Sequence, residues 1–372
     1  MKTMRSLLFG IILALGLHSI AFSQLKTVDF LAGGVGDAEK LFQEYLKPYA
    51  NMFGADLNAG WYNTAKPHKL GGFDLTITLN GSMAPSSDLV FNPNSIGLSS
   101  DAAITNGTQS PTAAGKKTDN RPVITYSKTA PAPIGKVPIA SKTLPDGSGI
   151  NFVPLPMIQL GIGLPKGTEV TVRLLPNLDL GDIGNIGLWG VGLKHSIIQW
   201  IPALSRLPIL DITAQGAYTK LKTYANINYE PLDIVADATH DYVSDPNKWL
   251  DQRLELGVTA WTANIVISET IPVISFYQAI GYSSSRVDLG LKGNFPFPSI
   301  ESRSGNSNFG DPVVTNDALG IINDPISLEM QNKKNLRLNA GFRIKLGVLT
   351  IHGDYTKSNY NVFTAGLGIS FR

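Results

Sequence analysis

The sequence predicts an all-β fold, a transmembrane antiparallel β-barrel with a short N-terminal helical plug. Three observations predict it: a C-terminal strand that alternates apolar and small residues, the same alternation repeated along the chain, and a secretory signal at the N-terminus. Successive side chains of a strand face opposite sides of the sheet, so alternation gives one apolar and one polar face. An apolar face toward lipid and a polar face toward a lumen are typical of outer-membrane barrels.

The C-terminal strand runs from Tyr360 to Arg372. One of its faces is apolar, and the other carries threonine, glycine and serine. The apolar face consists of Phe363, Ala365, Leu367, Ile369 and Phe371. An aromatic residue beside the chain end predicts recognition by the barrel-assembly machinery through this strand. The apolar face predicts contact with outer-membrane lipid.

Residues 1–23 have the features of a secretory signal peptide. Lys2 and Arg5 precede an apolar run from Leu7 to Leu17, and small residues surround an expected cleavage site before Gln24. The apolar run is too short to span a membrane. We therefore expect the signal to be cleaved and the protein to reside in the bacterial outer membrane.

The composition agrees with a barrel and excludes several other classes. Charged residues make up only 16% of the 372 residues, whereas a soluble domain carries about a quarter. Without Lys2 and Arg5, 29 basic residues balance 29 acidic ones, so no bulk charge attracts nucleic acid. There is no cysteine, which excludes disulfides, lipoprotein acylation and thiolate metal sites.

Residues 73–372 are expected to form the barrel, with at least ten strands and with twelve or fourteen as alternatives. A spanning strand needs only about 9–11 residues, and the clearest alternation runs from Leu336 to Gly347. Segments 252–268 and 273–294 also read as strands, but they lose their phase part-way. We interpret these breaks as β-bulges or as strand ends that rise beyond the lipid. A hairpin formed by 123–126 and 137–141 would raise the count to twelve.

Long connections are expected on the outer side and short ones in the periplasm, which places both chain ends in the periplasm. The long external loops are predicted at about 84–155, 230–251 and 295–334. The first is rich in Pro, Ser, Thr, Ala and Gly, which favours a mobile loop over an inward-folded constriction. Residues 196–208 are the exception on the periplasmic side, and we expect a short amphipathic helix there at the membrane interface.

Residues 24–72 are expected to form an N-terminal helical plug or cap. Within them, residues 37–47 have helical spacing of apolar side chains, and Pro48 is predicted to end the helix. The apolar face of this plug consists of Leu41, Phe42, Tyr45 and Leu46. Such a helix could fill the barrel or cap its periplasmic mouth. The alternative is a short helix that packs under the wall.

The candidate functional residues are charged or titratable side chains on the lumen faces of the strands. A tight turn at Gly347 would bring two strands together and align most of them on one inner face. These residues are Arg337, Arg343, Lys345, His352, Asp354, Arg173 and Glu169. Arg253 and Glu255 are likewise expected on the polar, inner face of their strand. We interpret them as pairs of opposite charge that brace the wall. The alternative is a cationic stripe that selects anionic solutes.

The histidines predict no metal site, and the serines predict no catalytic site. Of five histidines, His18 lies in the signal peptide, and the other four are widely spaced. We interpret His68 as a solvated residue of a polar turn. A hydrolase would need a Ser–His pair within hydrogen-bond reach; Ser358 follows His352 closely, but no nucleophile elbow is present. We therefore expect no enzyme, no metal and no cofactor.

The chain resembles a family of outer-membrane proteins of unknown function found in Bacteroidetes. The resemblance covers most of the mature chain but not the loop at 84–155. It rests on the helix 37–47, the run GWYNTAKPHK at 60–69, the strand pair 159–173, LWGVGLKH at 188–195, and the last strand. That family looks like a distant relative of long-chain fatty-acid transport barrels. Those transport barrels pair a fourteen-stranded wall with an N-terminal plug, and for this chain the resemblance implies only plugged-barrel transport in general.

Two functions remain open at this point. The first is passive uptake or passage of a small hydrophobic or amphipathic solute. The second is a non-transporting membrane anchor or an accessory subunit for secretion or surface assembly, whose protein partners the sequence does not indicate. An open lumen favours the first, and a lumen packed with side chains favours the second.

Overall fold

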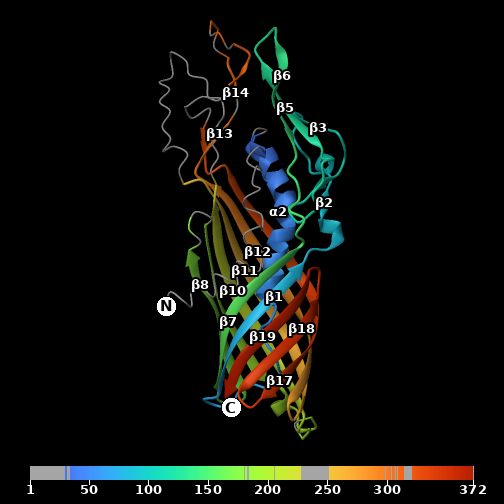
Figure 1. The fold of residues 1–372 in the computed structure, drawn as a ribbon, viewed down its shortest axis with the longest axis vertical. Helices are drawn as coiled ribbons and strands as arrows, with labels where there is room; N and C mark the ends of the chain where they lie inside the picture. Colours follow the sequence, from blue (N-terminus) through green and yellow to red (C-terminus); the bar gives the residue numbers. More distant parts are fainter. Residues whose placement is uncertain are drawn as a thin grey trace.

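The computed structural model describes residues 30–371 except 32–33, 180, 182–183, 205, 228–250, 298, 303, 306, 308 and 314–320. Within these residues, long antiparallel strands close into a barrel, and one helix lies along its lumen (Figure 1). No helix of the described part is long and apolar enough to cross a membrane. The predicted signal peptide and almost all of the predicted loop 230–251 lie outside the described residues.

Ten strands form the wall, which confirms the predicted fold class at its lower strand count. They are β1 (Phe73–Met83), β7 (Phe152–Leu164), β8 (Thr168–Asp179), β9 (Gly184–Ser196), β10 (Leu210–Asn226), β11 (Arg253–Ile271), β12 (Ile274–Lys292), β17 (Ile326–Leu346), β18 (Leu349–Lys357) and β19 (Asn361–Phe371). The first and last of them pair, Phe73 opposite Phe371, and close the ring. The hairpin expected at 123–141 exists, but it belongs to a separate sheet outside the wall.

The helix α2 (Val35–Asn58) enters the lumen from the end of the barrel that carries the long loops (Figure 1). It packs most closely against β1, β7, β10, β11, β12, β17 and β19 of the wall. Residues 59–72 continue through the lumen to the short-turn end, where β1 begins. The first described residue therefore lies at the long-loop end of the barrel, and the last one lies at the short-turn end. The prediction placed both ends of the chain on the same side, in the periplasm.

The helix continues for ten residues beyond Pro48, so the prediction that Pro48 ends it is wrong. A proline inside a helix removes one backbone hydrogen bond and costs about 3 kcal/mol. The residues after it offset this cost, because Tyr49, Met52, Phe53 and Leu57 are all buried in the core of the barrel. The packing of these residues against the barrel wall therefore outweighs the tendency of Pro48 to end the helix.

The apolar face of the long strands changes sides along their length. Near the short turns of β11, Trp261 and Ile265 face outward and are exposed. Near the long loops, Leu254 and Val258 of the same strand face inward and are buried in one cluster with the residues of α2. The pairing of β11 with both neighbours stays continuous. The breaks in alternation seen in the sequence therefore mark mainly the ends of strands that extend beyond the belt of outward-facing apolar side chains.

One register shift does occur on β12, between Ser283 and Ser285 opposite β17. The outward side chains above the belt are polar. Arg253 and Glu255, which the alternation placed on a polar inner face, instead point outward and form an ion pair of 2.7 Å. At this level of the barrel, the apolar side chains of α2 fill the lumen.

Residues 84–151 fold over the outer part of α2, and we call them the cap. They contain β2 (Val90–Phe91), β3 (Ala102–Thr105), β4 (Ser110–Pro111), β5 (Val123–Ala130), β6 (Gly135–Thr143) and the short turns η2 (Ser86–Asp88) and η3 (Pro93–Ser95). The Tyr45 hydroxyl donates to the Asp146 carbonyl at 2.7 Å, and the Tyr49 hydroxyl lies 2.8 Å from Ser148 Oγ. The prediction of a mobile loop is wrong, because the cap packs Ile124 and Leu144 in the same core as α2.

Two further connections differ from the prediction. β17 begins at Ile326, inside the predicted loop 295–334, and the segment before it contains β13 (Asn294–Pro296), β14 (Ser299–Ile300), β15 (Pro312–Val313) and β16 (Ile321–Asn323). The amphipathic helix expected at 196–208 is reduced to the 3-10 turn η5 (Ile198–Trp200). Trp200 is 67% exposed, as an interfacial anchor would be.

Candidate functional site

The lumen is filled with buried polar side chains from every strand of the wall. One buried inward residue from each strand, in chain order, is Thr78, Gln159, Arg173, Lys194, Thr219, Asn264, Ser285, Arg337, Thr356 and Thr364. In a water-filled pore these side chains would be exposed to solvent. Within the described residues, the interior of this barrel is a packed core.

The C-terminal end of α2 is held by wall side chains. Arg173 on β8 donates from Nη1 to the Leu57 carbonyl at 3.1 Å and from Nη2 to the Ala59 carbonyl at 2.8 Å. Arg337 on β17 donates to the Asn58 carbonyl. These are among the carbonyls that a helix end leaves without partners, and they carry the negative end of the helix dipole. The two arginines therefore neutralise and cap the plug.

Two uncharged side chains complete this cap. Asn80 on β1 donates through Nδ2 to the Asp56 carbonyl at 2.7 Å. Thr219 on β10 donates to the Leu57 carbonyl at 3.3 Å. Asp56 itself is fully buried and accepts a hydrogen bond from Ser82 Oγ at 2.9 Å. Burial raises the pKa of Asp56 well above its usual value, and the bond from Ser82 acts in the opposite direction.

Glycines on the inner wall make room for the chain that follows α2. A Cβ atom at Gly192 would lie 2.9 Å from the Trp61 ring, and one at Gly190 would lie 3.0 Å from it. The Arg173 guanidinium covers the same ring, with Cζ 3.9 Å from its centroid. Because only glycine leaves this space, the small residues between the apolar ones on β9 have a packing role.

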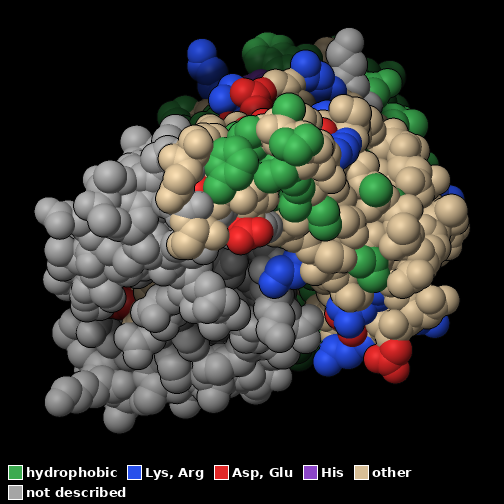
Figure 2. Space-filling view, turned by 90° about the horizontal axis from the view of Figure 1, so that it is seen from above, with side chains coloured by type: hydrophobic (Ala, Val, Ile, Leu, Met, Phe, Trp, Pro, Cys, Tyr) green, Lys and Arg blue, Asp and Glu red, His purple; other side chains and the backbone are tan. Residues whose placement is uncertain are grey.

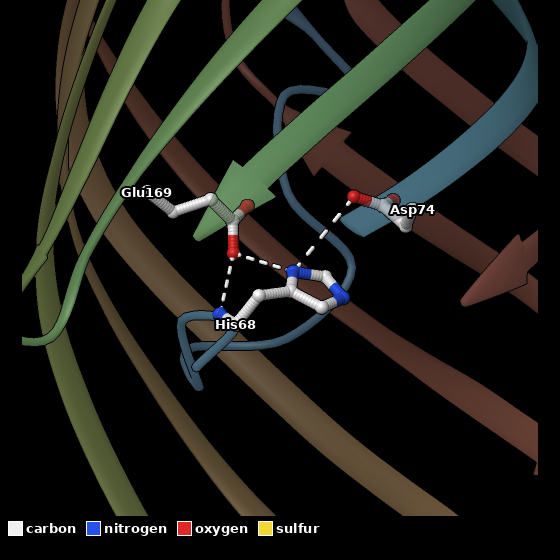
Figure 3. A group of neighbouring side chains, drawn as sticks. All are labelled: His68, Asp74 and Glu169. Atoms are coloured by element: carbon white, nitrogen blue, oxygen red, sulfur yellow. Dashed lines mark hydrogen bonds and ion pairs between the residues drawn. The ribbon is translucent and has the colours of Figure 1, made fainter. Parts of the chain in front are cut away.

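Farther down the lumen, His68, Asp74 and Glu169 form a buried cluster (Figure 3). His68 lies in the turn before β1, Asp74 on β1 and Glu169 on β8. Glu169 Oε2 accepts from the His68 backbone N–H at 2.9 Å and lies 2.8 Å from His68 Nδ1. Lys194 Nζ pairs with Glu169 Oε1 at 2.9 Å. The interpretation of His68 as solvated is wrong, because the polar turn that carries it folds into the lumen.

The cluster contains the types of ligand atom that a metal site needs, but one of its carboxylates already has a partner. One potential ligand atom from each of His68, Asp74 and Glu169 lies within 4.8 Å of the other two, and such nitrogen and oxygen ligands suit zinc and similar cations. The Lys194 ammonium already occupies one Glu169 oxygen. A divalent cation would have to compete with this ammonium for the same carboxylate, so these residues fit an ion-pair network better than a metal.

The same histidine also lies within hydrogen-bond distance of a serine and an acid, as the histidine of a catalytic triad does. His68 Nε2 lies 3.1 Å from Ser370 Oγ, and Nδ1 lies 2.8 Å from Glu169. Those distances suit a Ser–His–acid triad. A substrate, however, could not reach this serine, because Ser370 is 1% exposed and Lys345 Nζ also lies 3.4 Å from its Oγ. The arrangement ties the turn at His68 to strands on both sides of β1, to β8 through Glu169 and to β19 through Ser370.

The other predicted lumen residues gather on β17 and β18. Arg343 lies opposite His352 in the strand register, and both are buried, as are Arg337 and Asp354. Asp354 accepts from the Tyr277 hydroxyl at 2.9 Å and from Asn339 Nδ2 at 2.7 Å. The structure thus places the seven candidates on the inner side of the wall, but in three separate groups, around α2, around Asp354 and around His68.

The predicted plug residues are buried at the outer part of α2. Leu41, Phe42, Tyr45 and Leu46 share a core with the cap, and the Phe30 ring packs edge-on against Phe42 at 5.4 Å between centroids. Sequence reasoning missed Trp61, Asn80 and Lys194 as lumen contacts. The run of residues 60–69 held the available signal, since aromatic and charged side chains stand there before the first strand.

This architecture defines a closed ten-stranded β-barrel plugged by its own N-terminal helix. The chain belongs to the family of unknown function DUF6588, whose sequence profile matches residues 1–371. No curated protein matches the chain.

Several solved outer-membrane structures are similar in outline. An outer-membrane channel from Pseudomonas putida F1 is 10% identical, with 82% of this chain and 98% of that chain covered and a TM-score of 0.31. The translocator domain of the autotransporter NalP from Neisseria meningitidis is 8% identical, with 90% and 98% covered and a TM-score of 0.29. The outer-membrane protease OmpT from Escherichia coli is 8% identical, with 81% and 97% covered and a TM-score of 0.27. Likeness at this level carries no functional argument.

Proposed function

We propose that this protein is a sealed outer-membrane barrel that anchors the cap and the outer part of α2 at the cell surface. A belt of outward apolar side chains supports a place in a lipid bilayer. It includes Ile77, Val172, Val191, Ile265, Ile280, Leu338, Ile351 and Leu367, all well exposed. Short turns at one end and long connections at the other are the arrangement of bacterial outer-membrane barrels.

The packed lumen is the observation that carries this proposal. Arg173, which could have lined an anion pathway, is fully buried and donates to plug carbonyls. Arg337 does the same from the other side of the lumen. Both guanidinium groups are held by carbonyls of the plug, and separating these buried hydrogen bonds is costly. The plug is thus a structural part of the barrel.

The surface at the long-loop end supports the proposal that the barrel presents the cap and the outer part of α2 to other molecules. Seen from the long-loop end, the described surface mixes apolar, uncharged polar and scattered charged side chains (Figure 2). A groove of about 400 Å³ runs between α2 and the cap, beside Lys47 and Phe91. Such a surface suits contact with another molecule at the cell surface.

The second candidate is passage of a small hydrophobic or amphipathic solute. It is supported by a further groove of about 530 Å³ between α2 and β17, lined by Asn51, Glu329 and Asn332 among others. This groove reaches beside the plug from the long-loop end. Passage along it requires α2 to move away from the wall, because the lumen below is filled.

A disulfide that fixes the plug to β1 distinguishes the two proposed functions by experiment. The chain has no cysteine, so Asp56→Cys with Ser82→Cys introduces a single pair where the side chains now touch at 2.9 Å. Solute uptake is measured in proteoliposomes that contain the folded barrel, oxidised or reduced. A sealed anchor gives no uptake in either state. Uptake by the reduced barrel that oxidation abolishes would establish the second function and contradict the first.

A further inference from the structure

Two lysines on the outer face of β10 stand where the apolar belt ends. Thr219 and Leu221 are fully buried on the inner face, which puts Lys220 and Lys222 on the outside. Lys220 lies opposite Trp189 in the register with β9. The Trp189 ring packs 5.7 Å from the Tyr218 ring, as aromatic residues do at the edge of a membrane belt.

An apolar groove lies directly beside these lysines. It has a volume of about 280 Å³ and is lined by Leu174, Pro176 and Trp189 together with both lysines. Its wall is formed where the pairing of β8 with β9 shifts between Leu175 and Leu178. The irregular strand therefore creates a hollow on a surface that regular pairing would leave flat.

A second hollow of about 450 Å³ adjoins the first and shares both lysines. Its lining is mixed and includes the uncharged polar side chains Asn185, Thr223 and Thr259. Lys222 lies opposite Gly187 on one side and Gly257 on the other. With no side chain on either neighbour, the Lys222 ammonium stands in a trench that is open to a ligand.

The charges around the two lysines leave them available. Glu255 and Asp288 also line the second hollow, but each pairs with an arginine. Arg253 Nε lies 2.7 Å from Glu255, and Arg286 Nε lies 3.0 Å from Asp288. No ion pair joins Lys220 or Lys222 to a carboxylate among the residues that the structure describes. Two neighbouring ammonium groups that form no ion pair within the described part of the chain favour an anion.

We propose that this groove binds a phosphorylated membrane lipid, with the phosphate between Lys220 and Lys222 and one acyl chain against Leu174 and Trp189. The proposal rests on the proposed place of the barrel in a bilayer. A phosphate accepts several charge-assisted hydrogen bonds from ammonium groups. The apolar hollow below it continues the lipid-facing belt, so a single lipid satisfies both halves of the site.

The test uses Trp189 as a reporter within the groove. Phosphatidic acid with brominated acyl chains is titrated into the folded, detergent-solubilised protein, and tryptophan fluorescence quenching is recorded. Trp189→Phe identifies the part of the quenching that comes from the groove. The Lys220→Gln, Lys222→Gln double variant is compared with a matched control, Lys116→Gln with Lys117→Gln, two exposed lysines of the cap.

We expect the Lys220, Lys222 variant to need about thirtyfold more phosphatidic acid for half-quenching, which corresponds to about 1 kcal/mol for each of the two lysines near an anionic head. The cap control should match the wild type, and brominated phosphatidylcholine should quench weakly in all proteins. Equal quenching in the double variant would overturn the site. Displacement of the lipid by millimolar inorganic phosphate alone would overturn the lipid assignment. Because binding is measured without a membrane potential or uptake, a leaking barrel would contradict the sealed anchor and leave this result unchanged.

Discussion

Arg173 and Arg337 donate hydrogen bonds to consecutive carbonyl groups of one helix end from opposite sides of the barrel. Arg173 contacts the Leu57 and Ala59 carbonyls, and Arg337 contacts that of Asn58. Their strands, β8 and β17, are separated by five steps in the closed ring of ten. The plug is therefore held across the full width of the lumen, and both charges face the negative end of the helix dipole.

Removing either arginine should loosen the plug. Arg173→Met or Arg337→Met leaves buried carbonyls without a donor, and we expect a loss of about 2–3 kcal/mol in the free energy of unfolding. Urea unfolding of the folded barrel in detergent measures it. Arg286→Met removes an arginine of the outer surface that pairs with Asp288 and Glu329, and it should change the midpoint little. An equal loss in all three variants would contradict a role in holding the plug.

The close approach of α2 to β12 at Gly54 should tolerate no side chain. A Cβ atom there would lie 2.6 Å from Ser285 Cβ, and overpacking of this kind costs about 1–3 kcal/mol. We expect Gly54→Ala to lower stability by that amount and the added change Ser285→Gly to recover most of it. Gly36→Ala is the control, because nothing lies within 4 Å of its Cβ position. Stability is read from thermal unfolding, and a neutral Gly54→Ala would show that the helix is not packed on this strand.

The barrel itself could be predicted from the sequence because alternation is a local property of a strand. The clear pattern that begins at Leu336 coincides with the observed β17, which ends at Leu346, one residue before the end of the pattern. The plug's full length could not be predicted, since the helix beyond Pro48 is stabilised by wall residues distant in the sequence. The same reason explains the cap, whose few apolar residues suffice only because α2 supplies the other half of their core.

The lumen contacts were predicted in part. The inward side of Arg173, Arg337 and Asp354 followed from alternation, but their partners did not, because alternation gives the face of a side chain and not its neighbour. His68 was misread, since a polar turn gives no local sign that it will fold back into a barrel. Arg253 and Glu255 were misplaced because the apolar face moves from the lipid side to the plug side along β11.

Stability should fall as pH rises because of Asp56. A carboxyl whose pKa is raised on folding binds its proton more tightly in the folded protein, so stability declines from the unfolded pKa up through the folded one. We expect the unfolding midpoint of the wild type to drop more between about pH 4 and about pH 8 than that of Asp56→Asn. Asp101→Asn, at an exposed carboxylate of the cap, should keep the wild-type dependence. Parallel curves for wild type and Asp56→Asn would refute the assignment.

Ser370 should be unreactive despite its distance of 3.1 Å from His68. It is buried, and reaction with a substrate needs access that the packed lumen does not give. A fluorophosphonate probe, which labels activated serines, should leave the intact mass of the folded protein unchanged. An adduct that disappears in both Ser370→Ala and His68→Ala would instead identify a hydrolase and overturn the structural reading of the cluster.

The most direct test of the account asks whether the N-terminal segment threads the lumen and leaves it sealed. Gly36→Cys and Leu70→Cys place single thiols at the two ends of the plug segment, and Leu70 is 72% exposed at the short-turn end. Intact cells are treated with a polyethylene-glycol maleimide too large to cross the outer membrane. We expect labelling of Gly36→Cys at once and of Leu70→Cys only after the membrane is permeabilised. Labelling of Leu70→Cys in intact cells, or protection of Gly36→Cys, would contradict it.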